Sequence, residues 1–185
     1  MMRAFISVEL PNEVKKKAAE LIDDLKKSEA GVKWVEPKNL HITLKFLGWV
    51  KESKLDKVAE LTARAVAGVS GFKAKFTGIG TFPEGKAPRV VWVGTAEGGE
   101  GLCKLAQNLE TALSAAGFRS EAREFKPHLT IGRVKDKKNL DQLVKRINSV
   151  KDAELGAAVV DRIFIMKSTL TRSGPIYEKF KEVKL

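Results

Sequence analysis

The chain has 185 residues, 43% of them hydrophobic and 31% charged, which suits a single domain spanning residues 1–185 and excludes a disordered chain. Its net charge of +11 favours an anionic partner such as nucleic acid, although a solvated lysine-rich surface would give the same count. No apolar run reaches the roughly 18 residues that span a bilayer, and the single Cys103 cannot form an internal disulfide, so we expect a cytoplasmic protein with no membrane partner.

The first half of the chain alternates strand and helix patterns. Residues 5–8 alternate apolar and polar side chains, as a half-buried strand does, and residues 11–28 follow with helical spacing. Two further alternating segments, 32–35 and 40–48, predict strands on either side of a proline turn. Residues 53–67 again have helical spacing, so a second helix should cover the sheet.

The middle of the chain predicts two strands, at residues 72–79 and 89–94. They are separated by a loop over residues 82–88 that contains two prolines and a glycine. A loop of this kind between two strands could border a functional site.

The second half repeats the order of the first. A helix is expected over residues 101–116, a strand over 125–134 and another helix over 140–150. The tail predicts strands at 157–167 and 177–183, joined by a turn that contains glycine and proline.

Strands interleaved with helices, with neighbouring strands able to pair as antiparallel hairpins, predict an α+β fold with the helices outside the sheets. Two segments of this fold are alike, because residues 41–44 and 128–131 each contain histidine, an aliphatic residue, threonine and another aliphatic residue. The match suggests two related lobes. A pseudo-two-fold relation between them would bring His41 and His128 together across a cleft.

His41 and His128 are the only histidines in the chain, and their shared context makes chance an unconvincing explanation. Imidazole, with an ordinary pKa of about 6.5, is well suited to proton exchange near neutral pH. Two imidazoles in opposite protonation states can act as base and acid on either side of a reacting phosphorus. Along each strand, strict alternation places Thr43 and Thr130 on the histidine face, where their hydroxyls could donate hydrogen bonds to phosphate oxygens. The same alternation would place Lys45 there as well.

Two other uses of these side chains are less favoured. A zinc site would need ligands from elsewhere in the chain, because neither histidine has another histidine, cysteine or carboxylate at chelating spacing. Nucleophilic catalysis by Cys103 lacks any nearby feature that would activate a thiolate, and a buried structural cysteine is the more common case.

The paired motifs at His41 and His128 resemble the twin HxTx signature of the 2H phosphoesterase superfamily, and within it the RNA 2',3'-cyclic phosphodiesterases, also called 2'-5' RNA ligases. The resemblance extends over nearly the whole chain, including residues 3–8 and the ending from 167 to 177. It implies a bilobal fold with antiparallel sheets around a central cleft.

The same resemblance implies hydrolysis of the 2',3'-cyclic phosphate at an RNA end, tRNA fragments included, to a 2'-phosphate. His41 would be the proton donor and His128 the proton acceptor. No metal or cofactor is implied, and we expect a monomer. Joining of the cyclic end to a 5'-hydroxyl would use the same groups.

The resemblance also implies that Arg133 binds phosphate and that Phe46 stacks on the terminal base. Strict strand alternation puts each on the face opposite its histidine, so both need a break in the alternation, for which Gly132 offers a means near Arg133. Otherwise Phe46 would pack in the core and Arg133 would be a solvated charge.

Other basic residues near the motifs could guide an RNA backbone, namely Lys45, Arg89, Arg123 and Lys126. Two alternative functions stay open at this point. One is a phosphodiesterase for small cyclic nucleotides, and the other is a nucleotide- or RNA-binding module without turnover.

Overall fold

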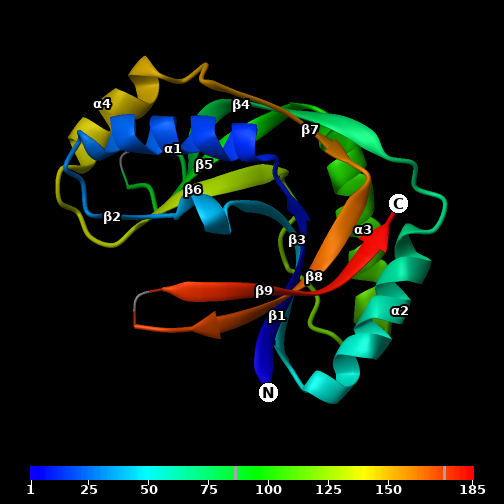
Figure 1. Ribbon diagram of the computed structural model, residues 1–185. Coiled ribbons are helices and arrows are strands. Elements are labelled where there is room, and N and C mark those ends of the chain that lie inside the picture. The colour runs from blue at the N-terminus through cyan, green and yellow to red at the C-terminus, as the bar shows by residue number, and fades with distance from the viewer. Residues whose placement is uncertain (86, 173) are drawn as a thin grey trace.

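The computed structural model describes residues 1–85, 87–172 and 174–185, which form two antiparallel β-sheets and four α-helices (Figure 1). The α+β prediction is thus confirmed. The helices are α1 (Asn12–Lys26), α2 (Leu55–Val66), α3 (Gly99–Ala115) and α4 (Leu140–Ser149). The strands are β1 (Met2–Glu9), β2 (Val32–Trp34), β3 (His41–Val50), β4 (Phe72–Phe82), β5 (Val90–Glu97), β6 (His128–Val134), β7 (Glu154–Val160), β8 (Arg162–Leu170) and β9 (Pro175–Lys184).

The two sheets have related strand orders. The first sheet runs β3-β1-β8-β9 and the second runs β2-β6-β5-β4-β7. His41 begins β3 and His128 begins β6, so each histidine starts a strand. β3 pairs with β1 and β6 pairs with β5, which gives the two histidine strands equivalent neighbours. β3 also contacts β6, and the two sheets therefore meet along the strands that carry the histidines.

The helices lie outside the sheets, and each sheet is covered by a pair of them (Figure 1). α1 packs against β7 and α4, whereas α3 packs against α2 and β3. The helix after β1 of the first sheet thus covers the second sheet, and the helix after β5 of the second covers the first. This exchange ties the two halves of the fold together.

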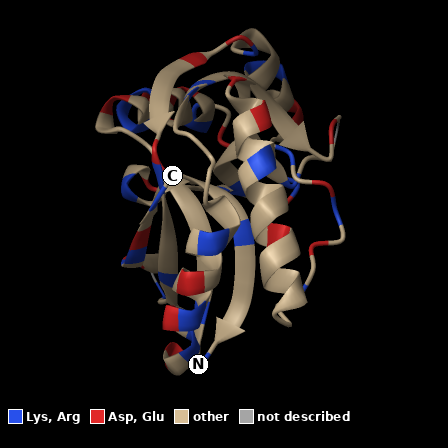
Figure 2. Ribbon diagram, turned by 90° about the vertical axis from the view of Figure 1, so that its right-hand side faces the viewer, with Lys and Arg blue, Asp and Glu red and all other residues tan. Residues whose placement is uncertain are grey.

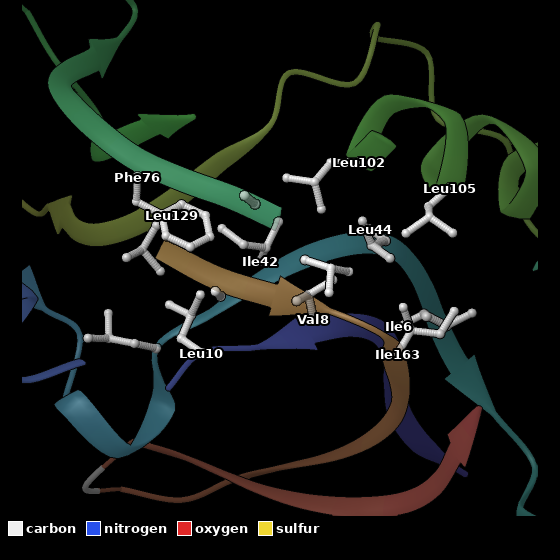
Figure 3. Close-up of a cluster of buried hydrophobic side chains, with 14 of the residues drawn as sticks. Ile6, Val8, Leu10, Ile42, Leu44, Phe76, Leu102, Leu105, Leu129 and Ile163 are labelled. Carbon is white, nitrogen blue, oxygen red and sulfur yellow. The ribbon is translucent and has the colours of Figure 1, made fainter. Parts of the chain in front are cut away.

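A continuous hydrophobic core fills the space between the sheets and the helices (Figure 3). Ile42 and Leu129, which directly follow the two histidines, are both fully buried in this core. Since successive side chains of a strand point to opposite faces, the histidines face away from the core. Burial of each such aliphatic side chain contributes about 1.5–3 kcal/mol to folding, and it holds each motif in register.

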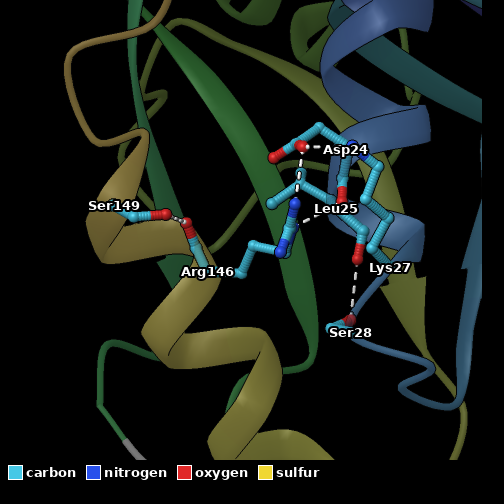
Figure 4. A network of polar contacts seen from close by, with 6 residues as sticks. All are labelled: Asp24, Leu25, Lys27, Ser28, Arg146 and Ser149. Atoms are coloured by element: carbon cyan, nitrogen blue, oxygen red, sulfur yellow. Dashed lines mark hydrogen bonds and ion pairs between the residues drawn. The ribbon is translucent and has the colours of Figure 1, made fainter.

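An ion pair joins the two helices that cover the second sheet (Figure 4). Arg146 on α4 donates through Nε to the backbone carbonyl of Asp24 and through a terminal nitrogen to its carboxylate, both at 2.6 Å. A guanidinium that donates two hydrogen bonds to one residue fixes the relative orientation of the two helices as well as their distance.

On the side of the molecule covered by α2 and α3, acidic and basic residues are interspersed (Figure 2).

Two predicted boundaries are wrong. The strand expected at 157–167 is two strands, because the chain leaves the second sheet after β7, passes Asp161 and enters the first sheet as β8. A change of sheet without a turn leaves no signal in a pattern of apolar residues. The strand expected from residue 125 begins instead at His128, directly after Pro127, which lacks the N–H that a ladder requires.

No helix in the described ranges has the length and apolar character that a membrane crossing requires.

Candidate active site

His41 and His128 are anchored in the same way. The Nδ1 of His41 lies 2.7 Å from the carbonyl oxygen of Asn39, and the Nδ1 of His128 lies 2.6 Å from that of Lys126. A carbonyl only accepts hydrogen bonds, so Nδ1 carries the proton and donates it in both residues. In each neutral imidazole, Nε2 is therefore the nitrogen that can take up a proton. In both motifs, the carbonyl that accepts this hydrogen bond belongs to the residue two positions before the histidine.

The threonines lie where alternation predicts. The Thr43 hydroxyl is 3.0 Å from Nε2 of His41, to which it donates when the ring is neutral. Thr130 is half-buried and stands directly opposite Trp92 of β5. Each threonine thus shares the exposed face of its strand with a histidine.

Aromatic rings surround both histidines. Phe5 stacks on His41 with ring centroids 4.8 Å apart, and Tyr177 meets His41 edge-on at 5.2 Å. Phe82 meets His128 edge-on at 5.3 Å, with Trp92 at 6.5 Å. These rings restrict the tilt of each imidazole and exclude water from one side of it.

The sequence patterns did not identify the roles of Phe5 and Tyr177, and they placed Phe82 only at the start of a loop that could border a site, whereas it is the last residue of β4. They come from strands far from the motifs in the chain, and no local spacing marks them. Strand pairing is the only signal that could have found Phe5, since it lies in the strand that pairs with β3.

The histidine pKa values are both lowered, chiefly by burial, which disfavours the charged form. The backbone carbonyls oppose this effect, and the positive charge of Arg133 adds to it at both histidines. Burial raises the pKa of Tyr177, and the positive charge of Arg133 partly opposes that rise. The charge of one guanidinium from β6 therefore acts on His41 and Tyr177 of the first sheet and on His128 of the second.

A β-bulge in β3 alters the faces of the residues after Thr43. Ile6 of β1 pairs with Lys45 and Ser7 pairs with Thr43, so Leu44 is an extra residue that shifts the alternation. Phe46 consequently lies on the same face as His41, 52% exposed, with its ring centroid 6.4 Å from that of Phe5.

The same bulge overturns the prediction for Lys45, which is neither on the histidine face nor available to RNA. Its side chain turns into the core, where Nζ donates at 2.7 Å to the carboxylate of Glu110 and to the carbonyl of Arg119. The pKa of Glu110 is lowered even though burial acts to raise it, because Lys45 and Ser114 donate hydrogen bonds to its carboxylate. Arg89, Arg123 and Lys126 are exposed.

A matching bulge in β6 brings Arg133 to the histidine face. Val91 pairs with Gly132 and Trp92 pairs with Thr130, so Ile131 is the extra residue. Gly132 has its own reason to lack a side chain, because a Cβ there would lie 2.8 Å from atoms of Trp34 and Val32. The break in alternation needed for Phe46 and Arg133 is present in both strands.

A cavity of about 170 Å³ lies beside His41, between β1, β9 and the residues that precede β3. Three lysines and one carboxylate line it: Lys15, Lys38, Lys179 and Glu9. Lys15 lies 3.6 Å from Glu9, and its charge contributes to the low pKa of His41. The side chains that line the cavity therefore carry a net positive charge, which suits an anionic ligand.

Among the residues that the structure describes, no group of three or more His, Cys, Asp or Glu side chains is placed to hold a metal ion. Cys103 is exposed on α3 rather than buried as the sequence suggested. Partial burial and the charges of Glu124 and Glu100 raise its thiol pKa, which is the opposite of what an activated nucleophile needs. Lys86, in the loop expected to border the site, lies outside the described residues.

Residues 14–172 match the family model of the 2'-5' RNA ligase superfamily. The chain belongs to this superfamily. The resemblance inferred from the twin motifs is thereby confirmed.

Several relatives in the superfamily match nearly end to end. A Methanothermobacter thermautotrophicus protein named RNA 2',3'-cyclic phosphodiesterase is 38% identical over 184 residues, covering 100% of this chain and 99% of the relative. A Thermotoga maritima protein of the same name is 42% identical over 181 residues, covering 98% and 94%. The crystal structure of E. coli LigT complexed with 3'-AMP has a TM-score of 0.80 and 26% identity, covering 100% of this chain and 98% of that one.

Proposed function

We propose that this protein hydrolyses the 2',3'-cyclic phosphate at the 3' end of RNA to a 2'-phosphate, using His41 and His128 as acid and base. The names of its full-length relatives support the activity. The observation that carries the mechanism is the matched anchoring of the two imidazoles through Nδ1, because it makes Nε2 the nitrogen that exchanges a proton in both rings, at His41 beside the Thr43 hydroxyl. The influence of Arg133 on both rings supports a single phosphate site between them.

The reaction needs one proton removed and one supplied. Nε2 of neutral His128 takes a proton from water as the water oxygen attacks phosphorus, and the bond from phosphorus to the 3' oxygen breaks. Protonated His41 gives its Nε2 proton to that departing oxygen, which leaves a 2'-phosphate and a 3'-hydroxyl. Exchange with solvent then restores both protonation states.

Charge that develops on the phosphoryl oxygens needs donors already in place. Thr43, Thr130 and Arg133 share the faces that carry the histidines, and each can donate a hydrogen bond to phosphate. Such donors stabilise the transition state most when they need no rearrangement. The bulge in β6 is what makes the arginine part of this set.

Phe46 extends the site beyond the phosphate. Half-exposed on the histidine face, it offers a ring on which the terminal base can stack, whatever the base. In a ligation reaction, the 5'-hydroxyl of a second RNA would replace water as the nucleophile, the bond from phosphorus to the 3' oxygen would break as in hydrolysis, and a 2'-5' linkage would form. Because one chain supplies both histidines, we infer that residues 1–185 act as one domain and as a monomer.

The direct test uses a short RNA ending in a 2',3'-cyclic phosphate, incubated with the protein in the presence of EDTA. We expect a 2'-phosphate product, identified by end-group analysis, and activity that EDTA does not abolish. A 3'-phosphate product would contradict the assignment of the leaving oxygen. Turnover of small cyclic nucleotides with none of RNA, or tight RNA binding without product, would favour the two alternative functions.

The pH dependence should reflect the lowered histidine pKa values. A base that must be neutral and an acid that must be protonated give a bell-shaped profile of kcat/KM. Because both pKa values lie below the ordinary value, the optimum of kcat/KM should fall on the acidic side of about pH 6.5.

NMR titration of the two imidazoles of the free protein checks the same point. Each ring should gain its proton only as the pH falls below about 6.5. An optimum above pH 7.5, or a ring that is protonated at pH 7, would contradict the burial argument.

A further inference from the structure

Trp49 is an exposed aromatic residue that the proposed chemistry does not use. It is 66% exposed, and Phe46 on the same strand is 52% exposed. Within the described part of the chain, these two are the aromatic residues among the exposed large apolar side chains. An exposed tryptophan on the strand that begins with His41 offers a large, flat apolar face on which a ligand can stack.

Strand pairing places Trp49 on the face that carries His41 and Phe46. Phe5 of β1 pairs with Phe46, and Arg3 pairs with Trp49. Residues directly opposite in an antiparallel pair share a face. Because β1 pairs regularly with β8 from Arg3 to Ser7, Arg3 and Phe5 point to the same side. Phe5 stacks on His41, which identifies that side as the one with the candidate site.

Arg3 provides a second, independent sign of this placement. It is exposed, and its positive charge acts on the hydroxyl of Tyr177, which borders His41. Pairing continues from Arg3 to Ser168 and on to Tyr177, so one row of residues crosses the sheet from Trp49 to the edge of the site. Successive rows on this face are about 7 Å apart, because each row advances two residues along a strand.

The rows combine rings and positive charge in the order that a single strand of RNA requires. His41 would meet the cyclic phosphate, Phe46 the terminal base, and Trp49 lies one row further along the same strand. Base stacking on aromatic rings tolerates any sequence, and a basic residue beside the rings can hold the connecting phosphate.

We propose that Trp49 and Arg3 form a second nucleotide subsite, in which Trp49 stacks on the base before the terminal one and Arg3 binds the phosphate between them. This inference rests on the proposed function, and it makes the protein prefer RNA strands over cyclic mononucleotides. The net charge of +11 and the continuity of the surface with the candidate site favour RNA over a protein partner.

The kinetic test compares a five-nucleotide RNA ending in a 2',3'-cyclic phosphate with a 2',3'-cyclic mononucleotide. Trp49→Ala should raise KM for the RNA about tenfold, the loss of one base stack, with kcat unchanged. Kinetics on the mononucleotide, which cannot reach the subsite, should stay within about twofold of wild type. Trp49→Phe keeps an aromatic face and should restore most of the affinity. Val159→Ala, an exposed apolar change on β7 of the other sheet, is the matched control and should leave both substrates unaffected.

A binding measurement keeps this inference separate from the proposed activity. The same RNA ending in a 2'-phosphate, labelled with fluorescein and followed by anisotropy, needs no turnover. Trp49→Ala should weaken its binding about tenfold. Arg3→Gln should reduce the slope of log affinity against log salt by about 0.7, the value for one phosphate contact on a single strand.

Two results would overturn the subsite. One is unchanged RNA binding and KM in Trp49→Ala, whether or not the protein hydrolyses cyclic phosphates. The other is a wild-type dimer in light scattering that Trp49→Ala converts to a monomer with RNA affinity unaltered, which would assign the surface to a contact between copies.

Discussion

Replacing His41 or His128 with alanine should lower kcat on a cyclic-phosphate RNA by about 10² to 10⁴-fold, the range for loss of one general acid or base. KM should change little, because the phosphate donors Thr43, Thr130 and Arg133 remain. The measurement is steady-state hydrolysis at saturating substrate. The double variant should be little worse than either single one, since an acid and a base that serve the same displacement at phosphorus act as a unit.

The chain offers a matched control for this experiment. Lys126 holds Nδ1 of His128 through its backbone carbonyl alone, so Lys126→Ala keeps that contact while it removes a neighbouring side chain. Its kcat should stay within about twofold of wild type. Thermal unfolding of both histidine variants should confirm that they fold. More than about a tenth of wild-type kcat in a folded variant would contradict the catalytic assignment.

Replacing Lys45 with methionine should destabilise the protein by about 3 kcal/mol, at the low end of the cost of breaking a buried ion pair. The Lys45 side chain is 1% exposed and that of Glu110 is 26% exposed, so the carboxylate left behind keeps some contact with water. The variant also loses the bond to the carbonyl of Arg119, in the loop that leads to His128. For a chain of this length the melting temperature should fall by roughly 6–12 °C.

The control is an ion pair of similar length on the surface. Lys57 and Glu60 are 2.9 Å apart on α2, both well exposed, and Lys57→Met should cost less than about 1 kcal/mol. The double variant Lys45→Met, Glu110→Leu should recover part of the loss, because it leaves no unpaired buried charge. Equal effects of Lys45→Met and Lys57→Met in urea unfolding would contradict the structural role of the buried pair.

Much of the architecture follows from local patterns in the sequence. Helical spacing predicts the four helices to within a few residues, because each helix buries one apolar stripe. The alternation around His41 and His128 predicts both strands and their threonines. The strand change at Asp161 could not be predicted, since one residue separates β7 from β8 and no glycine or proline marks the change of sheet.

Some of the site's neighbours depend on pairings between distant segments. Phe5 reaches His41 through the β1–β3 pairing, and Tyr177 does so from the last strand of the same sheet. No spacing along the chain encodes such contacts. They arise because the sheet places strands from both ends of the chain side by side.

The sequence by itself determined that each histidine shares a strand face with its threonine, because a period of two along a strand is a local property of the backbone. The positions of Lys45, Phe46 and Arg133 were decided only by the tertiary structure. One extra residue in a strand reverses the faces of the residues that follow it, up to the next such irregularity, and whether a strand carries that residue depends on the partner with which it pairs. The bulges at Leu44 and Ile131 therefore bury a lysine that alternation would expose, and they bring a ring and a guanidinium to the histidine face.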